Sequence, residues 1–467
     1  IADRSSEDQP DPGDRPVTIP VGDQAARYVR ITATKLDQPK GRKPLLALVE
    51  LEVLDASERN LAFNAQVEAK DSIEDHGWGK AQLTDGSRMS RTPGAISPLM
   101  RKEFTIGKPV RNARAYVTGV GYYELHINGE KYACHSALDP ARTDYNKRVA
   151  YSTYPLRALL RQGRNCVGAM LGQGWWSKAP RLLVQIEIEY EDGATERIVS
   201  DESWKWSSGP ILENSIYHGE TCDARLEQRG WNEPGFDDSE WLPVSVVDWD
   251  VQLTAQTIPP IGPLAPMPAK SITSPRPGVC VVDFGQNFSG WCRLEVGAPV
   301  GTKITLRHSE LLYPDGTVNQ ENLRSARATD TYITKGVGTE FYEPRFTYHG
   351  FRYVQIEGYP GRLTPDKIQG ILVATDLRRE GRFVCSNGLI NQIQENAVWG
   401  MRTNFHSIPT DCPQRDERQG WMGDAWMTSD AMLFNLDMPA AYSWFLRLIA
   451  DAEENGAVPD TVPRVWG

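Results

Sequence analysis

Runs of alternating apolar and polar residues occupy most of the chain before residue 376. The runs at 28–36 and 45–56 alternate over several residues, which is typical of half-buried β-strands. Similar runs recur through 98–265 and 266–375, where Asn-Gly and Asp-Gly pairs supply the backbone conformation that hairpin turns require. The pattern therefore predicts two antiparallel β-sandwich domains, one in each of these ranges.

The apolar period changes after Phe383. From Ile390 to Met401 apolar residues recur in steps of three and four, which marks one face of an α-helix. Ser386 is the expected N-cap of this helix, and Pro439 suits the first turn of a later one. We therefore expect a helical domain over 376–467, with helices within 389–405, 425–435 and 439–456.

Three segments depart from the two-sandwich pattern. Residues 1–20 are rich in Pro, Asp and Gly, so an irregular leader is expected there. Residues 156–163 predict a short amphipathic helix that Gly163 caps. Residues 21–97 resemble parts of a discoidin-type carbohydrate-binding module, in inverted order and without the middle strands. This partial β segment is either a sugar-binding remnant or plain scaffold.

Charge and composition narrow the classes of partner. The chain has 51 basic and 61 acidic residues and no basic block, which argues against a nucleic-acid partner. No run approaches the roughly 18 apolar residues that span a bilayer, so no membrane is expected either. The N-terminus lacks a signal-peptide pattern, yet a secreted or periplasmic location is favoured over the cytoplasm.

The side chains that often bind metals are scattered. The seven cysteines form no CxxC pair and have no nearby His at ligand spacing, so we expect neither a metal site nor a cofactor. His126, His308 and His349 lie within strand patterns, where a structural role is the commoner one. The 14 Trp and 17 Tyr supply faces on which sugars stack, but they also suit the cores of large sandwiches.

One short segment concentrates ionisable and aromatic side chains between two predicted helices. A loop held by helices can keep two carboxyl groups at a fixed separation, as glycoside hydrolysis requires. A surface ion-pair network has the same composition, so local composition leaves both interpretations open. The residues concerned are Asp411, Arg415, Asp416, Glu417, Arg418, Trp421 and Asp424.

The same segment resembles the signature of a known enzyme family. DCPQRDERQGWMGDAWMTSDAMLFN is similar, nearly residue for residue, to the motif of family 78 glycoside hydrolases, the bacterial α-L-rhamnosidases. Its flanks, ENAVWGMRTNFHSIPT and GAVPDTVPRV, match as well, and so do GYYELHINGEKY and DFGQNFSGW in the two sandwiches. The resemblance covers roughly residues 98–467 in the family's order.

This resemblance implies an inverting enzyme that releases terminal α-linked L-rhamnose within an (α/α)6 barrel. Glu417 falls at the position of the family's general acid. Asp411, Trp421 and Asp424 fall at positions that line the rhamnose pocket. Arg415 is assigned an orienting role.

Three expectations about the neighbours of the acid accompany this assignment. Neighbouring carboxylates and partial burial are expected to raise the pKa of Glu417, so that it is protonated at working pH. His406, close before the motif, is a further pocket candidate. The charged and aromatic segment 217–231 is expected to pack the first sandwich against the barrel.

The barrel looks truncated, because three helices cannot complete it. The general base is therefore expected beyond Gly467, in a missing C-terminal part or a second polypeptide. Two other functions stay open: a carbohydrate-binding or scaffold fragment without activity, and a related glycosidase or lyase on the same fold. The identity of the group that carries the rhamnose is not specified by the sequence.

Overall fold

The fold is described by a computed structural model of the 467-residue chain. It describes residues 97–464 apart from 133–134 and 177–178, and a few short stretches before residue 97. The chain divides into two compact units, Ile1–Pro93 and Gly94–Gly467. The predicted leader and most of the discoidin-like segment lie outside the described residues. All helices and strands given below belong to the second unit.

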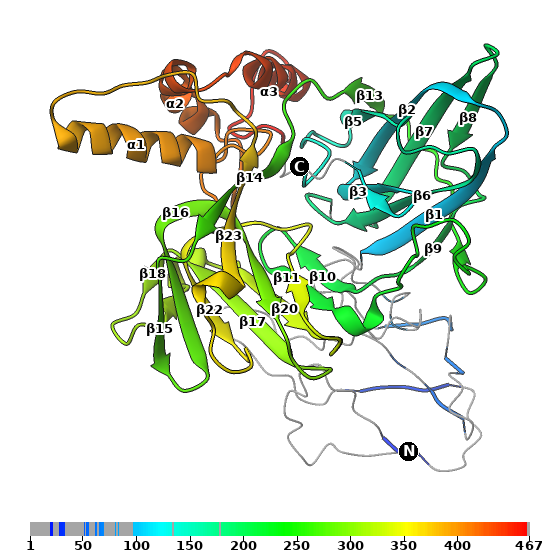
Figure 1. Ribbon diagram of the computed structural model, residues 1–467, viewed down its shortest axis with the longest axis horizontal. Coiled ribbons are helices and arrows are strands. Elements are labelled where there is room, and N and C mark those ends of the chain that lie inside the picture. The colour runs from blue at the N-terminus through cyan, green and yellow to red at the C-terminus, as the bar shows by residue number, and fades with distance from the viewer. Residues whose placement is uncertain are drawn as a thin grey trace. The chain divides into compact units, whose positions relative to one another are not determined.

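Two sheets build the first β domain, and their strands pair antiparallel except for β13 (Gln252–Ala255), which pairs with β5 (Arg148–Pro155) in parallel (Figure 1). Apolar side chains from both sheets, such as Ile127 and Val117, are almost completely buried between them. One sheet has the order β12 (Leu242–Pro243), β9 (Lys205–Ser208), β1 (Pro98–Ile106), β6 (Gly163–Gly172), β3 (Tyr122–Ile127) and β4 (Glu130–Lys131). The other has the order β13, β5, β2 (Val110–Val120), β7 (Arg181–Tyr190) and β8 (Thr195–Val199).

A ten-stranded sheet builds the second β domain. Eight strands follow the order β10 (Ile211–Ser215), β11 (Gly219–Asp223), β20 (Thr329–Ile333), β17 (Lys303–Ser309), β22 (His349–Glu357), β16 (Val279–Val296), β23 (Ile368–Thr375) and β14 (Ile261–Pro268). The other two, β15 (Ser271–Arg276) and β21 (Glu340–Tyr342), also pair with β16. A separate hairpin joins β18 (Leu311–Leu312) to β19 (Val318–Asn319).

Strand β11 links the two β domains. It comes from the sequence range of the first sandwich, but it pairs in parallel with β20 of the second sheet, with Thr221 opposite Thr331. The turn that precedes β11 therefore lies beside the segment that leads into β20. Tyr217 stands in this turn.

Three helices end the chain as the apolar period predicts: α1 (Gly388–Thr403), α2 (Met422–Asn435) and α3 (Pro439–Ala452). Pro439 occupies the first turn of α3, as expected. The prediction of Ser386 as N-cap is wrong by one residue. Asn387 caps α1, and its side-chain oxygen accepts from the backbone N–H of Leu389 at 2.9 Å.

The short helix predicted at 156–163 is also wrong. The segment forms one turn, in which the N–H groups of Leu159 and Leu160 both bond to the carbonyl of Leu156. Gly163 then opens strand β6 with a positive φ of 93°. A single turn does not offset the unfavourable free energy of helix nucleation, so the segment passes directly into the paired strand β6.

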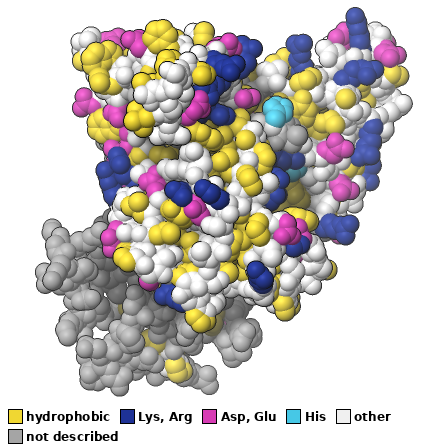
Figure 2. Space-filling model, turned by 60° about the vertical axis from the view of Figure 1, so that its left-hand side comes forward, with side chains coloured by type: hydrophobic (Ala, Val, Ile, Leu, Met, Phe, Trp, Pro, Cys, Tyr) yellow, Lys and Arg dark blue, Asp and Glu magenta, His cyan; other side chains and the backbone are white. Residues whose placement is uncertain are grey.

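The helices share one core with the first β domain, and α1 also contacts β16 and β23 of the second β domain. Trp444, Phe445 and Met401 are buried in the shared core, which includes Ala141 and Ala150 of the first β domain. Outside this core, the helices carry apolar side chains that are largely exposed, among them Ile393, Trp426 and Phe434. Hydrophobic side chains are visible over the helical part, at the top of Figure 2. Among the described residues, no helix is long and apolar enough to cross a membrane.

Candidate active site

The loop between α1 and α2, residues 404–421, is fastened by a buried arginine. Arg418 is fully buried, and its guanidinium donates to the carbonyl oxygens of Gln414 and Arg415 within the loop. It also donates to the carbonyls of Ile216 and Tyr348, both at 2.7 Å, in the second β domain. These four bonds hold the loop in one shape against that domain.

A second buried arginine fastens the loop to the first β domain. The Arg142 guanidinium donates to the side-chain oxygen of Gln419 at 2.6 Å and to the carbonyl of Arg418 at 3.1 Å. It also lies 3.7 Å from the ring centre of Trp175, a cation–π distance. Burial lowers the pKa of Arg142, the nearby tyrosines opposing this. The sequence offered no signal for this role.

Strand β22 supports the loop from below. A Cβ atom at Gly350 would meet the side chain of Pro413 at 2.7 Å and the backbone nitrogen of Gln414 at 3.0 Å. Any larger residue would push the loop away from the strand. Glycine therefore allows the loop to lie directly on the second β domain.

Glu417 stands on this loop with its carboxylate surrounded by donors. Arg415 Nε lies 2.9 Å and an Arg324 terminal nitrogen 3.0 Å from the same oxygen, Oε2. The indole N–H of Trp421 donates to Oε1 at 3.0 Å. The backbone carbonyl of Glu417 accepts from the hydroxyl of Tyr217 at 2.8 Å, which fixes the position of the residue.

The electrostatic environment of Glu417 differs from the expectation. Partial burial acts to raise its pKa, but the hydrogen bond and charge of Arg415, with smaller contributions from Trp421 and Arg324, outweigh it. The pKa therefore lies below the ordinary value, and the expected rise is wrong for this state of the site. The reason is that the guanidinium groups of Arg415, on the loop, and of Arg324, in the second β domain, lie against the acid.

Asp411 lies next to Glu417, as predicted for a pocket built from this loop. An oxygen of each carboxylate lies within 4.8 Å of the other, and Arg415 bonds to both residues. Asp411 also accepts from the backbone N–H of Gln419 at 2.7 Å, and its side chain is only 5% exposed. Both Asp411 oxygens are thus engaged by the loop itself.

Trp421 and Asp424 lie at the start of α2. Trp421 precedes the helix, half-buried, with its indole directed at Glu417. Asp424 occupies the first turn and is exposed, and no hydrogen bond or ion pair within the described residues ties its carboxylate to the rest of the loop. The structure therefore gathers Asp411, Arg415, Glu417 and Trp421 in direct contact and leaves Asp424 apart from them.

His406 lies beneath the loop rather than on its open side. Its ring stacks on Tyr348 with 4.0 Å between centroids, and Nε2 bonds to the carbonyl of Val373 at 3.0 Å. Burial lowers the pKa of His406 to about 3, so the ring is neutral at physiological pH. In this position it supports the loop through packing.

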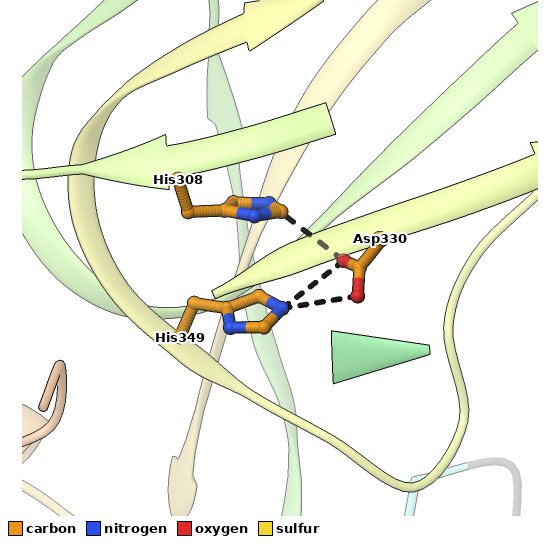
Figure 3. Close-up of side chains that lie close together, drawn as sticks. All are labelled: His308, Asp330 and His349. Carbon is orange, nitrogen blue, oxygen red and sulfur yellow. Dashed lines mark hydrogen bonds and ion pairs between the residues drawn. The ribbon is translucent and has the colours of Figure 1, made fainter. Parts of the chain in front are cut away.

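Three buried side chains of the second β domain have the residue types of a metal site (Figure 3). However, the rings of His308 and His349 stack with centroids 4.1 Å apart, and both face Asp330. An imidazole binds a metal with a lone pair in its ring plane, and the two nearly parallel rings direct these lone pairs side by side rather than toward one common point. His349 Nε2 lies 3.1 Å from both Asp330 oxygens, so buried hydrogen bonds hold the cluster together.

Family models match three consecutive parts of the chain. Residues 108–264 match an α-L-rhamnosidase N-terminal domain, and residues 273–374 match a bacterial α-L-rhamnosidase concanavalin-like domain. Residues 378–467, which contain the loop, match the six-hairpin glycosidase domain of the same family. The chain belongs to the bacterial α-L-rhamnosidases. Glu417 and its neighbours therefore lie in the part of the chain that matches the six-hairpin glycosidase domain.

Two curated α-L-rhamnosidases are similar to this chain over most of its length. One from Streptomyces avermitilis is 41% identical over 84% of this chain and 40% of its own length. One from Formosa agariphila is 36% identical over 78% of this chain and 41% of its own length. The chain thus spans about two-fifths of the length of these relatives.

Solved rhamnosidase structures agree with the fold. The α-L-rhamnosidase from Dictyoglumus thermophilum has 48% identity and a TM-score of 0.78, over 80% of this chain and 43% of that one. The Streptomyces avermitilis enzyme, solved in complex with L-rhamnose, has 40% identity and a TM-score of 0.79, over 83% and 38%. The predicted rhamnosidase family is therefore confirmed.

Proposed function

We propose that this chain supplies the general acid of an active site. That site hydrolyses the glycosidic bond of terminal α-linked L-rhamnose. The observation that supports this most is the Glu417 carboxylate, held by Arg415 and Trp421 on a loop that two β domains fasten. Such a carboxyl group, once protonated, can donate its proton to the departing glycosidic oxygen. Trp421 and Asp424 would line the pocket, the indole as an apolar wall and the carboxylate as an acceptor for sugar hydroxyls.

The proposed reaction inverts the anomeric carbon in a single displacement. Asp411 is the carboxylate nearest to Glu417, and its closeness would suit the separation of about 5–5.5 Å in a retaining enzyme. However, Asp411 is buried and both its oxygens accept bonds from the loop, so it is a poor nucleophile. We therefore assign the second carboxyl, which activates water about 6.5–9.5 Å away, to a part of the enzyme outside this sequence.

The helical part is proposed to be the beginning of an (α/α)6 barrel. Its exposed apolar residues, among them Trp426 and Phe434, suit a surface that further helices cover. Those helices would come from a C-terminal continuation or a second polypeptide, and the remaining pocket walls with them. The domain ranges stated above, the export of the protein and the identity of the rhamnose-bearing glycoside or polysaccharide stay predictions.

A comparison of two substrates with different leaving groups tests the role of Glu417 in the full-length enzyme. Glu417→Gln is expected to lower kcat/KM by about 10²–10⁴-fold on a rhamnoside whose leaving group needs a proton. An activated aryl rhamnoside needs no such proton, so its loss should be smaller. Equal losses on both substrates would contradict the acid assignment.

The anomer of the fresh product tests inversion. Proton NMR during the first turnovers should show β-L-rhamnose before mutarotation mixes the anomers. If α-L-rhamnose forms first, the mechanism retains configuration, and Asp411 has to be reconsidered as the nucleophile.

A further inference from the structure

Arg324 reaches the acid from a different domain. It follows the short 3-10 turn Glu321–Leu323 in the second β domain and has φ 58° and ψ −116°. This backbone conformation favours glycine because a Cβ atom is crowded there. Residues kept in such conformations are held by their surroundings, and they cluster at functional sites.

Asp416 fastens this turn to the loop between α1 and α2. Its Oδ2 accepts both the backbone N–H and the hydroxyl of Ser325, the residue after Arg324. The segment 324–325 is thereby tied to the residue that precedes Glu417. This anchor gives Asp416 a structural role and sets the distance from which Arg324 acts.

Two arginines compete for the same Glu417 oxygen, and they differ in freedom. Arg415 is 30% exposed and is also tied to Asp411 at 3.1 Å. Arg324 is 55% exposed, contacts Oε2 at 3.0 Å and lies 3.9 Å from Asp416. Because Arg324 has fewer partners and more solvent around it, it is the cation that can leave the acid.

We propose that Arg324 is a positioning residue that favours the carboxylate form of Glu417 before the sugar enters and moves away when the sugar enters. This inference rests on the proposed acid role of Glu417. Once Arg324 has left, Glu417 takes a proton from solvent more readily, and the guanidinium keeps its own charge throughout. The charged and titratable groups around the carboxylate are Arg415, Arg324, Asp411, Cys412 and Asp416.

The titration of Glu417 tests the inference without any need for turnover. In the full-length enzyme, the Glu417 carboxyl can be followed by carbon-13 NMR and assigned by its loss in Glu417→Gln. In Arg324→Gln the titration midpoint should rise by about half a pH unit, because one charge that favours the carboxylate is gone. Arg324→Lys should keep most of the wild-type midpoint.

Arg327 offers a matched control. It lies on the same segment, is equally exposed and pairs with Glu213 instead of Glu417. Arg327→Gln should leave the Glu417 midpoint unchanged. An unchanged midpoint in Arg324→Gln, or an equal shift in Arg327→Gln, would overturn the proposal. If Arg324→Gln does not fold, Ser325→Ala replaces it, since loss of the anchor should shift the midpoint in the same direction.

Two further measurements separate this inference from the proposed function. Added L-rhamnose should raise the midpoint in the wild type but not in Arg324→Gln, and an unchanged wild-type midpoint would contradict the movement. A general acid must be protonated, so kcat/KM falls as pH rises through its pKa, and Arg324→Gln should move that limb to higher pH. If the wild type releases no rhamnose, the proposed function fails, while the titration still reports on Arg324.

Discussion

The chain contains two clusters in which carboxyl groups lie against basic side chains, and the clusters differ in their access to solvent. In the buried cluster, Asp330 lies against His308 and His349, and its Oδ1 accepts the N–H of Glu220. In the loop cluster, Glu417 is half-buried and lies against the partly exposed side chains of Arg324 and Arg415. The residue types are similar, but the first cluster is closed to ligands and the second is not.

The larger pKa shift does not lie in the cluster that contains the candidate acid. Burial, with the charge of Asp330 adding to it, raises the pKa of Glu220 to about 8, despite a hydrogen bond from the Arg345 N–H. Burial raises and Arg415 lowers the pKa of Glu417, with a net decrease. The larger perturbation thus belongs to the structural cluster. A shifted pKa marks a functional site only where a ligand can reach it.

The largest expected effect on stability comes from breaking the buried cluster. Asp330→Ala should lower the free energy of unfolding by about 2–5 kcal/mol, because it leaves the His349 ring and the Glu220 N–H without their buried partner. Urea unfolding monitored by tryptophan fluorescence measures this. Asp366→Ala, at an exposed aspartate of the same domain, is the control. A loss of under about 1 kcal/mol at Asp330 would mean that the two clusters do not differ as described.

The next effect is a pH dependence of the free energy of unfolding, which Glu220 causes. Its pKa is raised in the folded state, so its contribution to stability is present below about pH 4.5 and is lost as pH rises through about 8. The wild type should therefore lose stability relative to Glu220→Gln across this window, by on the order of a few kcal/mol. The difference in unfolding free energy between the two, measured at several pH values, reports on it. A difference that stays constant with pH would contradict the raised pKa.

A smaller effect on stability is expected at the acid itself. Glu417→Gln should change the free energy of unfolding by less than about 1 kcal/mol, because its ion pairs are solvent-accessible. The same variant is the one expected to lose activity. A destabilisation as large as that of Asp330→Ala would show that Glu417 belongs with the structural cluster.

The smallest effect is expected at Asp424. Asp424→Asn should leave the free energy of unfolding within about 0.5 kcal/mol of the wild type, since the carboxylate is exposed. In the full-length enzyme it should raise KM for a rhamnoside if the carboxylate accepts a sugar hydroxyl. Thermal unfolding and initial rates measure the two quantities. An unchanged KM and kcat would remove Asp424 from the pocket.

Much of the fold could be predicted because its signals are local. The helices α1, α2 and α3 follow the change in apolar period, and Pro439 marks the start of one of them. The failures also have local causes: Asn387 and Ser386 are both good caps, and pattern alone does not choose between them. At 156–163 the amphipathic pattern was right for one turn only, because strand β6 begins directly after it.

The candidate site was predicted only in part. The motif placed Asp411, Arg415, Glu417 and Trp421 on one loop, and the structure brings these four together. The sequence predicts that segment 217–231 packs the first sandwich against the helical domain. Tyr217 belongs to this segment, and its hydroxyl bonds to the loop. Arg142 and Arg324 lie far away in the sequence and carry no local signature, so both were missed.

The sequence by itself determined the family, the order of strands and helices, and the loop that carries the candidate acid. These follow from short-range patterns and from a motif whose members are neighbours in the chain. Tertiary structure alone decided which charges face Glu417, because Arg324 reaches it only through the pairing of β11 with β20 and the packing of β22 under the loop. Electrostatic interactions depend on distance in space, so the ionisation of the acid is a property of the folded chain.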